Sequence, residues 1–293
     1  MQVFLKNFLI LSVSFWVSGL RGQPVGWRLR WPLPSPELQE NSGMVLIQGN
    51  LLFINDSKNE ARVFITDTLM GKLKFSCAIR KAVNVDWEDL AADADYLYIG
   101  DFGNNSGTRS HMAILRIPLS CLFSKPACNA EFIYFECEDQ REFHWRPQQH
   151  NFDFEALCVV GDSLLLFSKN WRDHNTRAYV LPKNPGHYKL RPRATLPVGG
   201  LITAADYLPS QKILALCGYQ PHGNSLEPFL ILWKNFSLKA LTTPSFKKIP
   251  LPQASQLQTE GLVCLAPHRF WISHEQDKRR NSSQPSLYEI TLL

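Results

Sequence analysis

Short apolar runs come in pairs along this chain, and each pair opens with an oxygen-bearing residue. An apolar run, a turn and a second apolar run recur five times. The second runs are 51–54, 96–99, 164–167, 213–216 and 270–272. Paired runs of this length, separated by turn residues, predict five β-hairpins.

The five hairpins have nearly equal lengths. The opening residue lies 13 positions before Asn55, Asp101, Ser168 and Ser273, which close four of the hairpins. In the fourth hairpin Thr203 lies 14 positions before Cys217, because residues 209–211 supply an extra turn position. The repeats begin 46, 67, 48 and 57 residues apart, which suits a unit of four short strands. The opening residues are Ser42, Glu88, Glu155, Thr203 and Glu260.

Third and fourth strands complete the units. Third strands are predicted at 62–66, 112–117, 177–181, 229–233 and 286–292, and fourth strands at 73–79, 131–137, 188–196 and 246–251. The last unit ends within its third strand, but a Pro-Leu-Pro segment precedes Ser42 at the same distance at which another precedes Glu260. We therefore predict that residues 27–33 form the missing outer strand.

These patterns predict an all-β, five-bladed β-propeller that is closed by an N-terminal outer strand on the last blade. Closure of this kind removes an exposed sheet edge. An irregular β-sandwich is the alternative, but it does not explain five equal hairpins. The insertion 139–151 accounts for the long spacing between the second and third units, and it either caps the channel or packs on the rim.

The composition agrees with an all-β fold, and the N-terminal residues indicate the cellular compartment. The chain has 45% hydrophobic residues, 19 Pro and 16 Gly, as expected of an ordered chain with many turns. An apolar run at 8–17 followed by small residues predicts a signal peptide over residues 1–22 and one propeller domain over 23–293. We therefore expect a secreted or periplasmic protein, and no later run is long enough for a membrane span.

Charge and cysteines exclude several classes of protein. Without Lys6 and Arg21 of the predicted leader, 29 Lys and Arg face 26 Asp and Glu, so the formal charge falls from +5 to +3. This is too weak to predict a nucleic-acid partner. The seven cysteines contain no CxxC pair, which excludes a thiol redox motif or zinc ribbon. Cys121 and Cys128 are close enough for a local disulfide, but the spacing does not identify a pair.

The repeat predicts a ring of oxygen ligands. The first strand of each propeller blade lines the central channel, so the five opening residues, Ser42, Glu88, Glu155, Thr203 and Glu260, should surround it. Two carboxylates about 4 Å apart repel by roughly 4 kcal/mol at an effective dielectric constant of about 20. Three of them require protonation or a cation, and oxygen ligands favour Ca²⁺. The alternative is that each Glu only accepts backbone hydrogen bonds in its own blade.

The order Ser, Glu, Glu, Thr, Glu resembles that of the soluble calcium-activated nucleotidases, the secreted apyrase family. This resemblance implies a five-bladed propeller with Ca²⁺ bound by Ser42, Glu88, Glu155, Thr203 and Glu260. The chain resembles uncharacterised secreted bacterial propeller proteins more closely, through 55–57, 86–89, 99–105 and 260–262. The nucleotidases' phosphate-binding Arg after the first hairpin has no counterpart at 55–59, so nucleotide hydrolysis does not carry over.

Polar residues collect where the second strands end, on the same mouth of the channel. Carboxylates, amides and a lysine that converge over a channel predict a ligand-binding face, although Asp and Asn are also common turn residues. The predicted ligand face comprises Asn55, Asp56, Asp101, Asn104, Lys169, Asn170, His274 and Glu275.

Three functions follow from this prediction. The first is a secreted propeller with Ca²⁺ in its channel and a small molecule or protein bound at the mouth. The second is a calcium-dependent hydrolase of a nucleotide or another phosphorylated substrate. The third is a protein-binding scaffold whose metal is purely structural.

Overall fold

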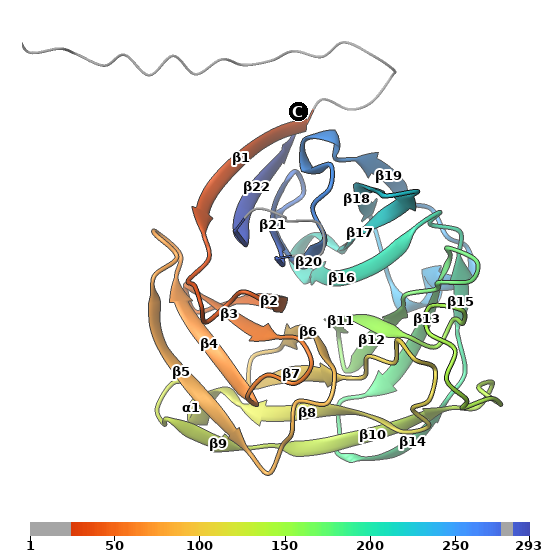
Figure 1. Ribbon diagram of the computed structural model, residues 1–293, viewed down its shortest axis with the longest axis horizontal. Coiled ribbons are helices and arrows are strands. Elements are labelled where there is room, and N and C mark those ends of the chain that lie inside the picture. Colours follow the sequence, from red (N-terminus) through yellow and green to blue (C-terminus); the bar gives the residue numbers. More distant parts are fainter. Residues whose placement is uncertain (1–24, 277–283) are drawn as a thin grey trace, which may run out of the picture.

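Five β-sheets surround a central channel, as Figure 1 shows. This computed structural model describes residues 25–276 and 284–293, so the predicted signal peptide lies outside the described residues. The sheets follow one another in chain order, and the inner strands contact their neighbours all the way round the ring. The prediction of a five-bladed β-propeller is confirmed.

Each blade contains four antiparallel strands, numbered here along the chain. Blade 1 contains β2 (Asn41–Ile47), β3 (Asn50–Asn55), β4 (Arg62–Asp67) and β5 (Leu73–Arg80). Blade 2 contains β6 (Trp87–Ala92), β7 (Tyr96–Asp101), β8 (Met112–Pro118) and β10 (Glu131–Cys137). Blade 3 contains β11 (Phe154–Val160), β12 (Ser163–Ser168), β13 (Thr176–Pro182) and β15 (Ala194–Leu196).

The last two blades follow the same plan. Blade 4 contains β16 (Leu201–Leu208), β17 (Ile213–His222), β18 (Ser225–Trp233) and β19 (Lys247–Pro250). Blade 5 contains β20 (Thr259–Ala266), β21 (Arg269–His274), β22 (Ser286–Leu292) and β1 (Val25–Pro32). Helical segments are short: α1 (Leu119–Leu122), η1 (Pro209–Gln211), η2 (Leu238–Thr242) and η3 (Pro252–Ala254). The first of the 3₁₀ turns, η1, forms the extra turn position of the fourth hairpin.

The N-terminal strand closes the ring as predicted. β1 pairs antiparallel with β22, from Val25 opposite Leu292 to Pro32 opposite Ser286. The ring of Trp27 stacks on Tyr288 with centroids 4.6 Å apart. The first described strand therefore completes the blade that the last strands begin.

One predicted strand is wrong. Residues 188–196 do not form a single fourth strand of blade 3. They divide into the end of β14 (Gly186–Leu190), which pairs in parallel with β10 of blade 2, and β15, which belongs to blade 3. Pro192 lies between them, and because proline lacks an N–H it interrupts the hydrogen-bonded ladder.

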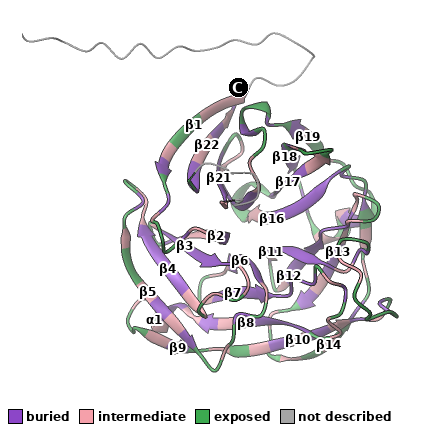
Figure 2. Ribbon diagram, viewed as in Figure 1, coloured by how far each residue is buried: buried purple, intermediate pink, exposed green. Residues whose placement is uncertain are grey.

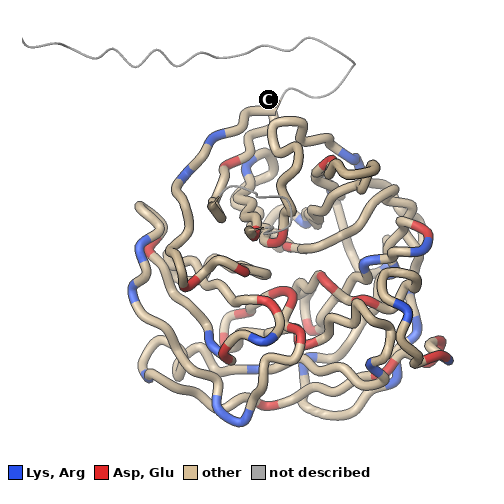
Figure 3. The backbone as a smooth tube through the Cα atoms, viewed as in Figure 1, with Lys and Arg blue, Asp and Glu red and all other residues tan. Residues whose placement is uncertain are grey.

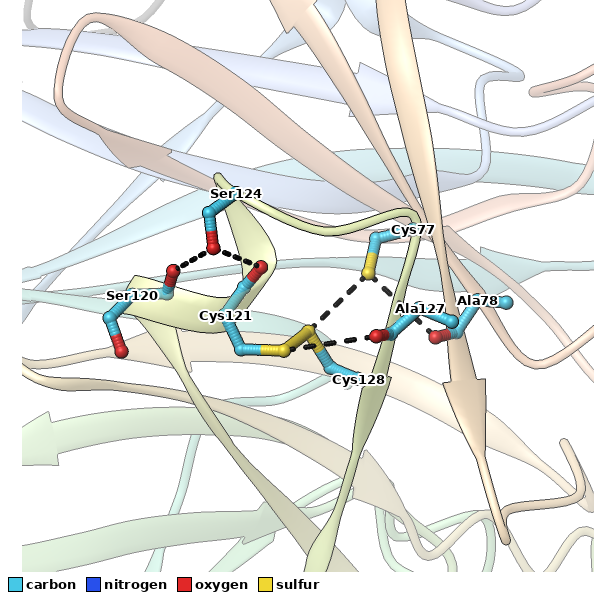
Figure 4. Close-up of a disulfide and its surroundings, with 7 residues drawn as sticks. All are labelled: Cys77, Ala78, Ser120, Cys121, Ser124, Ala127 and Cys128. Carbon is cyan, nitrogen blue, oxygen red and sulfur yellow. Dashed lines mark hydrogen bonds between the residues drawn. A yellow bond between two sulfur atoms is a disulfide. The ribbon is translucent and has the colours of Figure 1, made fainter.

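A disulfide anchors a second added strand. β9 (Ala127–Asn129) lies in the β8–β10 connection of blade 2 but pairs in parallel with β5 of blade 1. The Cys121–Cys128 disulfide joins β9 to α1, and the thiol of Cys77 on β5 lies 3.7 Å from Cys128 Sγ (Figure 4). The structure therefore selects the pair that sequence spacing left open.

Apolar side chains fill the spaces between blades. Five hydrophobic clusters each occupy one interface between neighbouring blades, and the inner strands are buried on both faces (Figure 2). This burial explains continuous apolar runs such as Leu164–Phe167 in β12, which would alternate with polar residues in a half-exposed sheet.

Two carboxylates, those of the buried Asp89 and the half-buried Asp206, join blades across the channel wall. Asp89 accepts hydrogen bonds from the backbone N–H groups of Leu157 in blade 3 (2.9 Å) and Ala205 in blade 4 (3.2 Å). Asp206 accepts one from Cys264 in blade 5 (2.7 Å). Burial raises the pKa of Asp89 well above its usual value and that of Asp206 to about 6.

Strand β1 allows a matched test of closure. Trp31 is 6% exposed and packs against Trp271, whereas Leu29 on the same strand is 53% exposed. We expect Trp31→Ala to cost about 3–5 kcal/mol of unfolding free energy, because it leaves a cavity between blades 5 and 1. Leu29→Ala should cost less than about 0.5 kcal/mol. Urea unfolding measures both, and equal losses would contradict this packing of β1.

Candidate metal centre and channel mouth

All five predicted ring residues lie at β-bulges. In each blade the register between the first and second strands shifts where the ring residue stands, so that the inner strand carries one extra residue there. A bulge turns a side chain away from the regular pleat. The five bulges contain Ser42, Glu88, Glu155, Thr203 and Glu260.

The two hydroxyl residues of the ring tie neighbouring blades together. Ser42 Oγ donates a short hydrogen bond to the carbonyl of Glu88, and Thr203 Oγ1 donates one to the carbonyl of Thr259 (2.6 Å). Each hydroxyl uses its proton in this bond and keeps its acceptor lone pairs. Both residues therefore have a structural role at the inner strands.

Glu155 is paired with a buried lysine. Lys169 Nζ lies 3.1 Å from Glu155 Oε2, and both side chains are nearly inaccessible to solvent. Burial is the main cause that raises the pKa of Glu155 well above its usual value, and the positive charge of Lys169 opposes the shift. The ammonium group therefore compensates this part of the ring.

Glu260 shares an amide with Glu275 of the predicted ligand face. Gln258 Nε2 donates a 2.9 Å hydrogen bond to Glu260 Oε1 and a shorter one to Glu275 Oε1. Burial raises the pKa of Glu260 to about 7. It also raises the pKa of Glu275 well above its usual value, with the charge of Glu260 adding to the shift.

Glu88 belongs to a third group, formed with two aspartates. One carboxylate oxygen from each of Asp56, Asp86 and Glu88 lies within 4.8 Å of the others. Burial followed by the charge of Asp56 raises the pKa of Asp86 to about 7, and burial raises that of Glu88 well above its usual value. These three acids repel one another and have no described cation in contact with them.

Gly103 leaves room for this group. A Cβ atom at that position would lie 2.1 Å from Glu88 Oε1 and 2.5 Å from Asp86 Oδ2, so any side chain would displace the carboxylates. Arg109 holds the glycine loop, because it donates to the carbonyl of Gly103 (2.8 Å) and pairs with Asp101 (3.0 Å). At Gly103 the backbone of the loop therefore lies directly against the carboxylates of Glu88 and Asp86, with no side chain between them.

The predicted ligand face divides into two sets. Asp56, Lys169 and Glu275 lie at the mouth, close enough to affect one another's pKa. Other members are held by hydrogen bonds within their own loops or to a neighbouring loop. Asn104 donates its backbone N–H to Asp153 (2.6 Å), and Asn170 accepts from Ser168 (2.6 Å).

Two members of the face keep a buried atom without a partner. Asn55 donates to the carbonyl of Glu37 (2.7 Å), but its Oδ1 has no hydrogen-bond partner among the described residues. His274 Nδ1 contacts the carbonyl of Glu275, and its Nε2 likewise has no partner among them. Burial lowers the pKa of His274, so this ring is neutral near pH 7.

Three residues at the mouth were missed as candidates by sequence reasoning. Asp86 and Gln258 precede the first strands of their blades, outside the aligned hairpins. Asp153 accepts hydrogen bonds from Asn104 and from Trp171 Nε1 (2.8 Å). One feature of the sequence could have identified two of them, because Asp86 and Asp153 both lie two positions before a ring Glu.

Acidic positions gather around the channel. Figure 3 shows Asp and Glu concentrated near the centre of the ring, while most Lys and Arg lie on the outer strands and loops. The insertion 139–151 packs on the rim, where Arg146 N donates to Ser106 O (2.9 Å) and Gln148 N donates to Asn105 O (3.0 Å). The acidic residues near the centre thus contrast with the positive net charge of the chain.

The donor set fits a hard divalent ion. Asp56, Asp86 and Glu88 bring three carboxylate oxygens together, one from each residue, and Ca²⁺ takes six to eight oxygen ligands that can include carbonyls and water. A soft or nitrogen-seeking ion such as Zn²⁺ prefers Cys and His. The geometry is thus suitable for Ca²⁺.

Comparison with known proteins identifies the fold alone. No family model matches the chain, and no curated protein matches it in sequence. The structure is similar to an exo-β-1,3-galactanase from Phanerochaete chrysosporium solved with β-1,3-galactotriose, with TM-score 0.55 and 8% identity over 90% of this chain. The chain spans only 64% of that protein.

Other solved structures are similar to this chain with lower TM-scores. They include the NanB sialidase of Streptococcus pneumoniae, with TM-score 0.45 and 8% identity over 83% of this chain and 35% of that one. They also include the WD40 β-propeller domain of Doa1, with TM-score 0.39 and 9% identity over 90% of this chain and 97% of that domain. The β-propeller fold itself rests on the five sheets of the chain. No helix among residues 25–276 and 284–293 is long and apolar enough to cross a membrane.

The raised pKa values predict how stability depends on pH. Asp86 and Glu260 have pKa values of about 7 in the folded chain, against usual values of 3.8 and 4.5. Between these limits the two groups hold more protons in the folded state than in the unfolded state. Their contribution to stability is therefore fully present below pH 4 and is lost as the pH rises through 7.

With chelator present, we expect the melting temperature to fall by at least about 5 °C between pH 5 and pH 8, since each pKa unit is worth about 1.4 kcal/mol. The Asp86→Asn/Glu260→Gln variant should show a smaller fall. A wild-type melting temperature that stays constant over this range would contradict the raised values.

Proposed function

We propose that this protein binds a calcium ion at the mouth of its channel, through Asp56, Asp86 and Glu88. The observation that carries the proposal is the approach of three carboxylates to within 4.8 Å of one another. Like charges at this distance need a cation or protons, and at neutral pH a divalent ion is the stronger compensation.

The metal in this proposal lies on one side of the predicted ring. Glu88 belongs to both sets of residues, whereas Ser42, Glu155, Thr203 and Glu260 have other contacts in the folded chain. Asp56 and Asp86 supply the additional carboxylates. The proposal therefore keeps the predicted cofactor but draws its ligands from blades 1 and 2.

A polar ligand without net negative charge suits the rest of the mouth. The two described cations there are already paired, Lys169 with Glu155 and Arg109 with Asp101. A nucleotide would therefore meet carboxylates unless the metal ion attracted it. We propose an oxygen-rich, uncharged ligand, such as a sugar, whose hydroxyls complete the calcium shell, and the galactotriose complex of the similar galactanase supports the ability of this fold to hold such a ligand.

Export is part of the proposal. The predicted leader over residues 1–22 and the Cys121–Cys128 disulfide both suit an oxidising compartment outside the cytoplasm. Calcium is abundant in such compartments, so a site of modest affinity would be filled there.

Calcium-dependent hydrolysis is a second candidate. Glu260 has a pKa of about 7 and lies at the mouth, where a carboxyl group can donate or accept a proton at neutral pH. A panel of nucleoside di- and triphosphates and aryl glycosides, assayed with calcium and with chelator, tests it. Turnover that Glu260→Gln abolishes would establish an enzyme, whereas an inactive panel with retained calcium binding would leave a binding protein or a scaffold with a structural metal.

Calcium should raise the melting temperature of the wild-type protein. A ligand at a hundred times its Kd adds about 2.7 kcal/mol of stability, which is several degrees here. Asp86→Asn should weaken calcium binding by about tenfold or more, because the site loses one of three charges. The same variant should be more stable than wild type in chelator, because a repulsive charge is gone. Differential scanning calorimetry and isothermal titration measure both effects.

Two control variants sharpen this experiment. Glu60→Gln removes a carboxylate whose side chain is 80% exposed and should change nothing. Gly103→Ala should weaken binding like Asp86→Asn, whereas Gly26→Ala, whose Cβ would meet its nearest atoms at 3.5 Å, should not. Equal calcium binding by wild type and Asp86→Asn would overturn the site.

A further inference from the structure

Lys169 extends from the end of β12 into the acidic channel. Its backbone N–H donates to the carbonyl of Asp153 (2.7 Å), which fixes the start of the side chain. Lys169 is 4% exposed, and its Nζ lies 3.1 Å from Glu155 Oε2. A lysine this deeply buried is uncommon unless it is paired.

Two aromatic rings complete the surroundings of the ammonium group. Nζ lies 5.1 Å from the ring centroid of Trp171 and 5.6 Å from that of Tyr219, within the range of cation–π attraction. Trp171 is itself held by the hydrogen bond from its Nε1 to Asp153. Burial works against the charged form, yet Glu155 and Glu260 hold the pKa of Lys169 well above its usual value.

The acids of the predicted ring therefore fall into two halves. Glu155 and Glu260 lie within the electrostatic influence of Lys169, which is the compensating charge for both. Glu88 groups with Asp56 and Asp86, which have no described cation in contact with them. Lys169 is in direct contact with an acid of the first half, whereas it acts on the second half only at longer range, through Asp56.

We infer that Lys169 is a tethered cation that occupies the Glu155–Glu260 half of the channel in place of a metal ion. The channel therefore binds one divalent ion, whereas without the charge of Lys169 its acids would bind two. The position of that one ion, on the Asp56–Asp86–Glu88 side, rests on the proposed function. The role of Lys169 does not, because the Glu155–Lys169 pair and its aromatic walls exist without any metal.

The charge of Lys169 acts in two ways. It stabilises the metal-free fold, because Glu155 would otherwise be a buried and unpaired carboxylate. It also repels a divalent ion from its own half of the channel. A covalently attached cation cannot be removed by chelator, so this half of the channel stays neutralised at any calcium concentration.

Removal of the charge tests the inference. Lys169→Met should lower the melting temperature in chelator, and calcium should restore it. The rise produced by calcium should be about twice that of wild type or more, and titration calorimetry should show one additional equivalent of bound calcium. Glu155→Gln in the Lys169→Met background should abolish the additional equivalent and leave the other.

Two more variants keep the result interpretable. Lys248→Met is the matched control, because Lys248 is half-buried and lies 4.0 Å over Phe229 but outside the channel. It should lose stability without gaining calcium dependence. Lys169→Gln keeps a hydrogen-bond donor for Glu155. If Lys169→Met does not fold, Lys169→Gln should show the same additional equivalent of bound calcium.

The outcomes separate this inference from the proposed function. An unchanged calcium stoichiometry in Lys169→Met, or in Lys169→Gln if the first does not fold, would overturn the inference and leave the proposed site intact. No calcium bound by wild type but one equivalent gained by the variant would overturn the proposed site and support the role of Lys169. If calcium does not restore the stability that Lys169→Met loses, the inference is wrong and the Lys169–Glu155 ion pair has a structural role only.

Discussion

Buried negative charge at the axis is the constraint on which this propeller depends. Five inner strands meet around a narrow channel, and a bulge in each turns one polar residue out of the regular pleat. Three of those residues are glutamates, and Asp89 and Asp206 add two more carboxylates beside them. A buried carboxylate without compensation costs several kcal/mol, so each one needs a partner.

The chain meets this need in different ways along the channel. Asp89 and Asp206 are compensated by backbone N–H groups of other blades, and this makes them cross-links of the ring. Glu155 is compensated by Lys169, and Glu260 by the amide of Gln258 together with the same lysine. The carboxylates of Asp56, Asp86 and Glu88 have no ion pair with a described Lys or Arg, and Lys169 acts on Asp56 only at longer range.

Two sets of acids on the inner strands therefore have separate roles. The hydrogen bonds of Asp89 and Asp206 reach the backbone of other inner strands and hold the blades in place. The acids at the strand starts meet the loops that follow the second strands, and these loops carry Asp56, Gly103 and Lys169. A binding site at the mouth can change through its loops without disturbing the cross-links, because the two sets of contacts share few residues.

Strand-level predictions succeeded because they depend on local spacing. Equal hairpins, the Pro-Leu-Pro segments and continuous apolar runs are properties of short windows, and they predicted five blades and the closing strand β1. The prediction for 188–196 was wrong because Pro192 divides the run and the first half pairs with a strand of another blade. Parallel pairing between blades leaves no periodic signal in the sequence.

The sequence by itself determined the fold, the order of the blades and the residues that open each inner strand. The tertiary structure alone decided which cysteines pair, which ring residues share a cation, and that Asp86 and Asp153 belong to the mouth. The physical reason is that the compensation of a buried charge depends on distances of a few ångströms between side chains from different blades. Lys169 follows its strand like any loop residue in the sequence, and only the closed ring of blades brings its ammonium group against Glu155.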